Sequence, residues 1–183
     1  MHLHDRFATF LSASEIIEAT PALLNDQRRR FTSSPDIVLQ PNSVESVQKI
    51  MGFCFENRIR VTPQGGNTGL CGATVTTEGV LLNLSKLNRI RDINLADNSM
   101  TVEAGVILQN AQKAAAEAGR LFPLSLASEG SCQIGGNIAC NAGGLNVLRY
   151  GSMRDLVLGL EVVLPNGELV SHLQPLHKNT TGY

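Results

Sequence analysis

Two glycine-rich clusters constrain this chain more than any other feature of its sequence. The first cluster occupies residues 63–72, and the second places six glycines within residues 130–151. Glycine loses more backbone freedom on folding than any other residue, and in a helix it costs roughly 1 kcal/mol relative to alanine. The six glycines of the second cluster indicate that another group approaches the backbone closely there. A flat ring system and the crossing of two protein segments are the two alternatives.

The first cluster is a candidate anion-binding loop. It lies between two expected strands, and the chain contains neither the G-x-G of a Rossmann turn nor the G-K-[ST] of a Walker A loop. Glycine lets successive backbone N–H groups turn inward, and such arrangements bind anions. No Lys or Arg occurs between residues 61 and 75, so a bound phosphate would be held by backbone amides and by the side chains of Asn67 and Thr68. A pair of tight turns is the alternative interpretation.

The rest of the chain alternates between short apolar strands and amphipathic helices. An apolar run at 37–39 precedes a helical repeat of apolar side chains at 44–55, and strand character returns at 59–61. This order is typical of parallel strands packed under a helix. The fold class is therefore α+β. Further elements are predicted as strands at 80–84, 90–95 and 100–103, a helix at 106–118, and a hairpin of 158–164 with 168–173.

The N-terminal residues 1–24 are interpreted as a helical lead-in, interrupted at Pro21, because apolar side chains recur there at roughly helical spacing. Three successive arginines at 28–30 favour a solvated surface turn over an anion site.

Composition narrows the choice of partners. Charged residues make up 17% of the chain, the net charge is −1, and there is no Trp, so neither a basic footprint nor an aromatic platform for nucleic acid is present. The four cysteines form no C-x-x-C pair, which favours reduced thiols over a metal site. No apolar run is long enough to span a membrane, and we expect a cytoplasmic protein.

Taken together, five motifs resemble those of the FAD-linked oxidases, the flavoproteins of the vanillyl-alcohol-oxidase and p-cresol-methylhydroxylase type. Within that family the chain is most similar to the D-2-hydroxyglutarate dehydrogenases and their bacterial relatives. The resemblance runs from about residue 36 to residue 183. The motifs are VTPQGGNTGL at 61–70, GSCQIGGN at 130–137, NAGG at 141–144, LRYG at 148–151 and LGLEVVL at 158–164.

The resemblance implies an α+β FAD-binding domain of two subdomains, with the cofactor between them. Residues 1–35 would be the lead-in, and residues 36–183 an FAD domain truncated before its last segment, with the substrate domain absent. The first loop would wrap the FAD pyrophosphate, and the second region would line the ribityl chain and flavin ring. The implied cofactor-binding residues are Pro63, Gln64, Gly65, Gly66, Asn67, Thr68, Gly69, Leu70, Ser131, Gly135, Gly136, Asn137, Asn141, Gly143, Gly144, Tyr150 and Gly151.

Two positions depart from the family pattern. Cys140 stands where relatives often have Thr, and Gln27 stands where many carry Trp after an Asp. Some relatives attach flavin covalently through a His in the first loop, whereas this loop contains none, so non-covalent FAD is implied. The four histidines lie elsewhere, at His2, His4, His172 and His177.

The implied activity is hydride transfer from a D-2-hydroxy acid to FAD, with D-2-hydroxyglutarate as the model substrate and D-lactate or glycolate as alternatives. No catalytic or metal-binding residue is assigned, because the family's base and metal ligands belong to the absent domain. The chain alone is therefore expected to be inactive. The alternatives are a cofactor-binding module without turnover, and half of a split enzyme completed by a separately encoded substrate domain.

The absence of a histidine from residues 61–75 leads to a direct test. Acid precipitation of the FAD-loaded chain should release all of the flavin into the supernatant, because no covalent bond would hold it to the denatured polypeptide. The absorbance of the supernatant and of the washed pellet at flavin wavelengths measures this. A yellow pellet would contradict non-covalent attachment.

Overall fold

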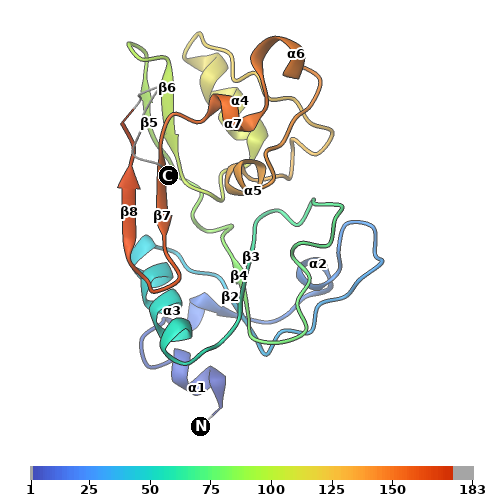
Figure 1. The fold of residues 1–183 in the computed structure, drawn as a ribbon, viewed down its shortest axis with the longest axis vertical. Coiled ribbons are helices and arrows are strands. Elements are labelled where there is room, and N and C mark those ends of the chain that lie inside the picture. Colours follow the sequence, from blue (N-terminus) through green and yellow to red (C-terminus); the bar gives the residue numbers. More distant parts are fainter. Residues whose placement is uncertain (1, 175–183) are drawn as a thin grey trace.

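A mixed four-stranded sheet forms the base of the first of two lobes in the computed structural model, which describes residues 2–174 (Figure 1). The sheet has the strand order β1–β2–β4–β3, in which β2, β4 and β3 are parallel and β1 is antiparallel. Every residue of the two central strands is buried, as expected for parallel strands covered on both faces. The bounds are β1 Ile16–Ile17, β2 Ile37–Leu39, β3 Val61–Gln64 and β4 Val80–Asn83.

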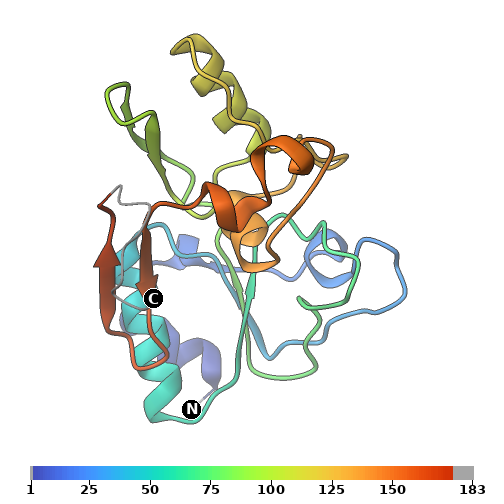
Figure 2. The same ribbon diagram turned by 45° about the horizontal axis from the view of Figure 1, so that its top comes forward.

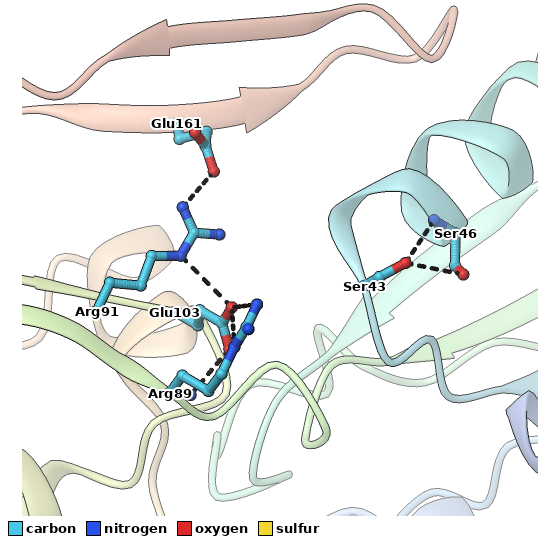
Figure 3. A network of polar contacts seen from close by, with 6 residues as sticks. All are labelled: Ser43, Ser46, Arg89, Arg91, Glu103 and Glu161. Atoms are coloured by element: carbon cyan, nitrogen blue, oxygen red, sulfur yellow. Dashed lines mark hydrogen bonds and ion pairs between the residues drawn. The ribbon is translucent and has the colours of Figure 1, made fainter.

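Helix α3 (Val44–Glu56) packs its apolar face into the core of this lobe. The helix begins after Ser43, whose hydroxyl accepts a hydrogen bond from the Ser46 backbone N–H at 3.1 Å, as an N-cap does (Figure 3). Val47, Ile50 and Cys54 recur at helical spacing and are buried. The helix predicted at 44–55 is confirmed.

The second lobe has its own core and lies above the first in Figure 1. Its side chains come mainly from the segment around α4 and from α5, with Leu108, Ile134 and Met153 nearly inaccessible. Two separate cores agree with the expected two-subdomain α+β fold. The elements of this lobe are β5 Ile90–Asn94, β6 Ser99–Val102, α4 Leu108–Glu117, α5 Ile134–Ala139, α6 Val147–Tyr150 and α7 Met153–Leu156.

The last hairpin, β7 (Leu160–Val163) with β8 (Leu169–His172), returns to the first lobe and lies along α3, as both views show (Figures 1 and 2). Its turn docks on the helix, where the Gln48 side-chain amide donates to the Gly167 carbonyl at 3.2 Å. A Cβ at Gly167 would lie 2.6 Å from the Gln48 carbonyl, so glycine is required for this approach.

An ion-pair network around a buried carboxylate links the second lobe to the hairpin through Arg91 (Figure 3). The Glu103 side chain is only 2% exposed and accepts from the Arg89 guanidinium at 3.0 and 2.8 Å, and Arg91 lies 3.4 Å away. Burial alone would raise the pKa of Glu103, but the hydrogen bonds from Arg89 and the charges of both arginines lower it. Arg91 also donates to Glu161 of β7 at 2.8 Å, which joins β5 to the hairpin.

The N-terminal region differs from the predicted helical lead-in. Only α1 (Leu3–Phe7) and α2 (Pro21–Leu24) are helical, the short 3-10 turn Ala13–Glu15 precedes β1, and Ile16–Ile17 pairs with β2. Pro21 starts a helix rather than ending one, because proline lacks only an N–H that the first helical turn leaves unpaired. Phe7 is completely buried in the first core, so this region is part of the lobe.

Most other predicted elements are found within one or two residues. The strand predicted at 59–61 instead runs from Val61 to Gln64, because Arg58 adopts a left-handed backbone with φ of 54° and Ile59 still bonds to the end of α3. Residues 175–183, including His177 and Tyr183, lie outside the described residues. Among the described helices, none has the length and apolar character needed to cross a membrane.

Glu15 connects the N-terminal region to the turn before α3 and makes stability depend on pH. Its buried carboxylate accepts from the Ser12 hydroxyl at 2.8 Å and from the Asn42 N–H at 3.2 Å. Burial raises the pKa, but the hydrogen bonds from Ser46, Ser12 and Asn42 outweigh it and lower the pKa from 4.5 to about 2. The resulting stabilisation is complete above the unfolded-state pKa and is lost as pH falls toward the folded-state value.

Glu15→Gln should therefore lower the free energy of unfolding by about 3 kcal/mol above pH 5.5, with the difference from the wild type shrinking as pH falls toward 2. Urea denaturation at several pH values measures this difference. Glu18→Gln, at an exposed position nearby, serves as the control and should follow the wild type at every pH. A pH-independent difference for Glu15→Gln would contradict the assignment.

Candidate cofactor site

Three neutral amide side chains lie at the carboxyl ends of the parallel strands, where open sheets commonly bind ligands. Gln40 follows β2 and donates to the Asn83 Oδ1 at 3.0 Å, and the Asn83 amide donates to the Gln64 Oε1 at 3.1 Å. Asn83 and Gln64 are almost fully buried. The row of amides fixes the exit of β3, from which the first glycine loop continues.

Some glycines are required because two protein segments cross. A Cβ on Gly66 would lie 2.0 Å from the Ser131 carbonyl oxygen, and one on Gly135 would lie 2.7 Å from the Ala104 Cβ. Gly144, with φ of 123°, would place a Cβ 2.1 Å from the Ser125 carbonyl. At these three positions, glycine is needed because another segment of the protein passes too close for a side chain. The first contact also brings the two predicted regions, around residues 66 and 131, directly together.

Two glycines of the predicted site have no such reason. A Cβ on Gly69 or on Gly136 would meet no atom of the described chain within 4 Å, and neither residue has a positive φ. Glycine in helix α5 costs roughly 1 kcal/mol relative to alanine. No contact within the described chain requires glycine at position 136, and the space beside it would admit a cofactor lying against the backbone.

Gln133 is buried between the lobes and is only half satisfied. Its side-chain amide donates to the Ser85 hydroxyl at 3.1 Å, but its Oε1 atom has no hydrogen-bond partner among the described residues. The side chain borders a cavity of about 290 Å³ that Ser85, Asn88 and Asn110 also line. An unpaired buried acceptor is costly, and a ligand or water that donates a hydrogen bond would remove the penalty.

The Asn67 side chain does not have the role expected from the sequence. Its amide nitrogen donates to the carbonyls of Ala22 and Asn25 at 3.1 and 2.7 Å, and its Oδ1 accepts from the Thr74 hydroxyl at 2.8 Å. With its donors and its acceptor engaged in this way, the side chain shapes the loop and does not point to an anion. The backbone amides and the Thr68 hydroxyl remain the groups of this loop that could hold a pyrophosphate.

The second predicted region is held by its own contacts. Asn137 is buried, and its amide lies 3.6 Å from the Cys132 Sγ. Asn141, with φ of 46°, accepts from the Arg154 N–H at 2.9 Å, which ties the segment to α7. Tyr150 is 38% exposed and carries the Arg149 guanidinium 5.4 Å from its ring centroid.

The structure distributes the predicted residues over two facing segments, and the side chains that meet there are uncharged. Sequence reasoning missed Gln40, Asn83 and Gln133. Gln40 and Asn83 could have been found from the sequence, because each is a polar residue directly after a run of apolar strand residues. The predicted residues lie as follows: Pro63 and Gln64 end β3, Gly65 to Leu70 form the loop, Ser131 precedes α5, Gly135, Gly136 and Asn137 lie within α5, Asn141, Gly143 and Gly144 follow it, Tyr150 ends α6, and Gly151 separates α6 from α7.

Comparison with known protein families agrees with a fold of this kind. The family model described as FAD binding domain matches residues 35–172. The chain therefore belongs to the FAD binding domain family of flavoprotein oxidoreductases, and FAD is its cofactor.

Curated proteins of similar sequence show which members of the family this chain resembles. The chain is 40% identical over 183 residues to a D-2-hydroxyglutarate–pyruvate transhydrogenase of Saccharomyces cerevisiae, covering 97% of this chain and 37% of the relative. It is 45% identical over 159 residues to a D-2-hydroxyglutarate dehydrogenase of Xanthomonas citri, covering 86% of this chain and 34% of the relative. The chain thus spans about a third of the length of these relatives.

Solved structures share the fold at low sequence identity. An alkyldihydroxyacetonephosphate synthase superposes with a TM-score of 0.82 at 16% identity, over 92% of this chain and 37% of the other. A 6-hydroxy-D-nicotine oxidase of Arthrobacter nicotinovorans superposes with a TM-score of 0.74 at 22% identity, over 87% of this chain and 35% of the other. The α+β fold of FAD-linked oxidases is therefore confirmed.

The open glycine in α5 gives a test of the site. Gly136→Ala should leave the chain folded, or slightly more stable, because alanine favours a helix. If FAD uses that space, crowding by the new methyl should cost about 1–3 kcal/mol of binding, or a roughly 5- to 150-fold weaker Kd. Flavin fluorescence titration measures the Kd, and thermal unfolding without FAD measures stability.

Two further glycine variants are the controls for this test. Gly130→Ala should change neither quantity, because its Cβ would make an ordinary 3.5 Å contact with Gln109. Gly66→Ala should destabilise the chain even without FAD, because its Cβ would overlap the Ser131 backbone. Equal Kd values for the wild type and Gly136→Ala would remove residue 136 from the site.

Proposed function

We propose that this chain is the cofactor-binding part of an FAD-dependent D-2-hydroxy-acid dehydrogenase whose preferred substrate is D-2-hydroxyglutarate. The observation that carries the proposal is the 40–45% identity to relatives named for D-2-hydroxyglutarate, over nearly the whole of this chain. D-lactate and glycolate are the alternative substrates, and a curated relative in Schizosaccharomyces pombe is described as a putative D-lactate dehydrogenase.

In this proposal, the chain binds and orients FAD without covalent attachment. The backbone of residues 65–70 would face the pyrophosphate, and α5 with the segment 141–144 would lie against the flavin end. When bound, FAD would supply the redox chemistry by accepting a hydride from the carbinol carbon of the hydroxy acid. The chain's own contribution is a rigid, uncharged cradle of backbone amides, fixed by the Gln40–Asn83–Gln64 row.

The substrate-binding part would be supplied by polypeptide that corresponds to the remaining two thirds of the relatives, whether joined to this chain or separately encoded. We assign residues 36–183 to the FAD domain and residues 1–35 to a segment that supports it. An exposed apolar surface favours a covering partner, because Leu145 and Leu148 are 87% and 103% exposed, with Val147 and Tyr150 beside them on α6. Along the hairpin, Leu169 and Leu173 are also exposed, at 37% and 40%.

A chimera tests the proposed activity. This chain would replace the matching N-terminal third of the Xanthomonas citri relative, and the purified chimera would be mixed anaerobically with each hydroxy acid. D-2-hydroxyglutarate should bleach the flavin absorbance faster than D-lactate or glycolate. A chimera that binds FAD but is bleached faster by one of the other acids would overturn the substrate assignment.

The FAD-loaded chain alone is the second arm of this experiment. It should not be bleached within seconds by any of the acids, because in this proposal the substrate site and the general base belong to the two thirds of the relatives that these residues do not match. General acid–base help is typically worth 10²- to 10⁴-fold, before positioning is counted. Rapid bleaching of the chain alone would show that a complete active site lies within these residues.

A further inference from the structure

We propose that a short segment before the family's matched region, residues 21–33, sets the conformation of the glycine loop, and that Asn67 is the positioning residue that joins them. We name residues 21–33 the brace and residues 64–76 the cofactor loop. The consequence for FAD rests on the proposed function, whereas the coupling of the two segments is a property of the chain itself. The family match begins at residue 35, so the brace lies outside it.

Hydrogen bonds from the cofactor loop reach the brace within helix α2 and at the residue that follows it. Asn67 donates to the carbonyls of Ala22 and Asn25 at 3.1 and 2.7 Å. Gln64 donates to the Leu23 carbonyl at 2.9 Å. These carbonyls belong to a helix of four residues and to the residue that follows it. The loop side chains therefore satisfy main-chain acceptors that a short helix leaves unpaired, and each segment fixes the other.

The backbone of Asn67 adds a second constraint. Its φ is 53°, a left-handed conformation that non-glycine residues rarely adopt and that asparagine tolerates best. The preceding Gly66 lies against the Ser131 backbone. Asn67 is thus held on one side by the second lobe and on the other by the brace, and the direction of the next residues, Thr68 and Gly69, depends on both.

The brace is itself rigid. The buried Asp26 carboxylate accepts from the backbone N–H groups of Phe31, Arg30 and Arg28 at 2.7, 2.7 and 3.1 Å. The bond from Phe31 is the largest contribution to lowering the pKa of Asp26, so the carboxylate is charged at neutral pH. The three arginines therefore form a tight turn, with Arg29 at φ of 54°, as the sequence indicated for a surface turn.

The far end of the brace contacts the far end of the cofactor loop. The Ser33 hydroxyl accepts from the Thr76 N–H at 3.2 Å. A Cβ added to Gly72 would lie 3.5 Å from the Phe31 ring. The Phe31 ring therefore packs against the loop backbone at residue 72. Thr74 donates to the Asn67 Oδ1 and closes the loop upon itself. The two segments are therefore linked at residues 64, 67, 72 and 76.

This coupling matters because the loop carries no Lys or Arg between residues 61 and 75. Without a mobile cation that can follow the phosphate, affinity depends on the fixed direction of the amides. Sites of this kind need their geometry held within roughly 0.5 Å. A loop that is mobile in the free protein must become ordered when the ligand binds, and this entropic cost lowers the affinity for the ligand.

Two variants in the full chain separate the brace from direct contact with the ligand. Asn67→Gly preserves the left-handed backbone and removes the amide bonds. Asp26→Asn loosens the turn of the brace and touches no residue of the predicted cofactor site. The matched control is Asn98→Gly, which replaces an asparagine of φ 51° in the β5–β6 turn. Hydrogen exchange without FAD reports loop order, and fluorescence titration reports the FAD Kd.

Both brace variants should speed amide exchange in residues 65–76 while leaving β2 and β4 unchanged, and should raise the FAD Kd at least ~10-fold, or ~1.4 kcal/mol. Asn98→Gly should change neither measurement. Unaltered exchange in the loop of both variants would overturn the inference, whatever their affinity. Faster exchange with an unchanged Kd would overturn the link to the cofactor. A wild-type chain that binds no FAD would defeat the proposed function alone, since exchange still decides whether the brace holds the loop.

Discussion

The close crossing of main chains between the two lobes is the constraint on which the rest of the structure depends. Gly66 against the Ser131 carbonyl and Gly105 against the Leu84 carbonyl each leave no room for a Cβ. At these points backbones meet without intervening side chains, so the separation of the lobes is fixed by hard contact and does not vary with side-chain rotamers. The spacing of the two glycine regions, and hence the shape of the cradle, follows from these contacts.

Within that frame the site is built from neutral dipoles. The amides of Gln40, Asn83 and Gln64 satisfy one another at the end of the sheet, and Asn67 satisfies α2. A satisfied network of this kind gives a single arrangement, because each alternative leaves a buried polar group unpaired. Gln133 is the exception among the described side chains, with its free Oε1 beside a cavity. A rigid network of side-chain amides beside one hydrogen-bond acceptor without a partner is the arrangement expected of a site preorganised for a ligand.

Elements with a strong local pattern could be predicted, whereas those made by distant partners could not. Helix α3 is predicted because its buried residues repeat at helical spacing and Ser43 caps it. Ile16–Ile17 gives no such signal, since it becomes a strand only by pairing with β2 more than twenty residues later. The glycines illustrate the same limit. Gly66 and Gly136 have the same sequence character, but one meets a backbone and the other meets open space, which only the fold decides.

The placement of the last hairpin has a consequence for how the chain folds. The bond between Gln48 and Gly167 joins residues 119 positions apart, and the hairpin covers the helix that covers the first sheet. During synthesis the first lobe therefore emerges with α3 uncovered on that side, and the cover arrives only after the entire second lobe has been made. Contacts of such long sequence separation slow folding, because a large loop must close before they contribute.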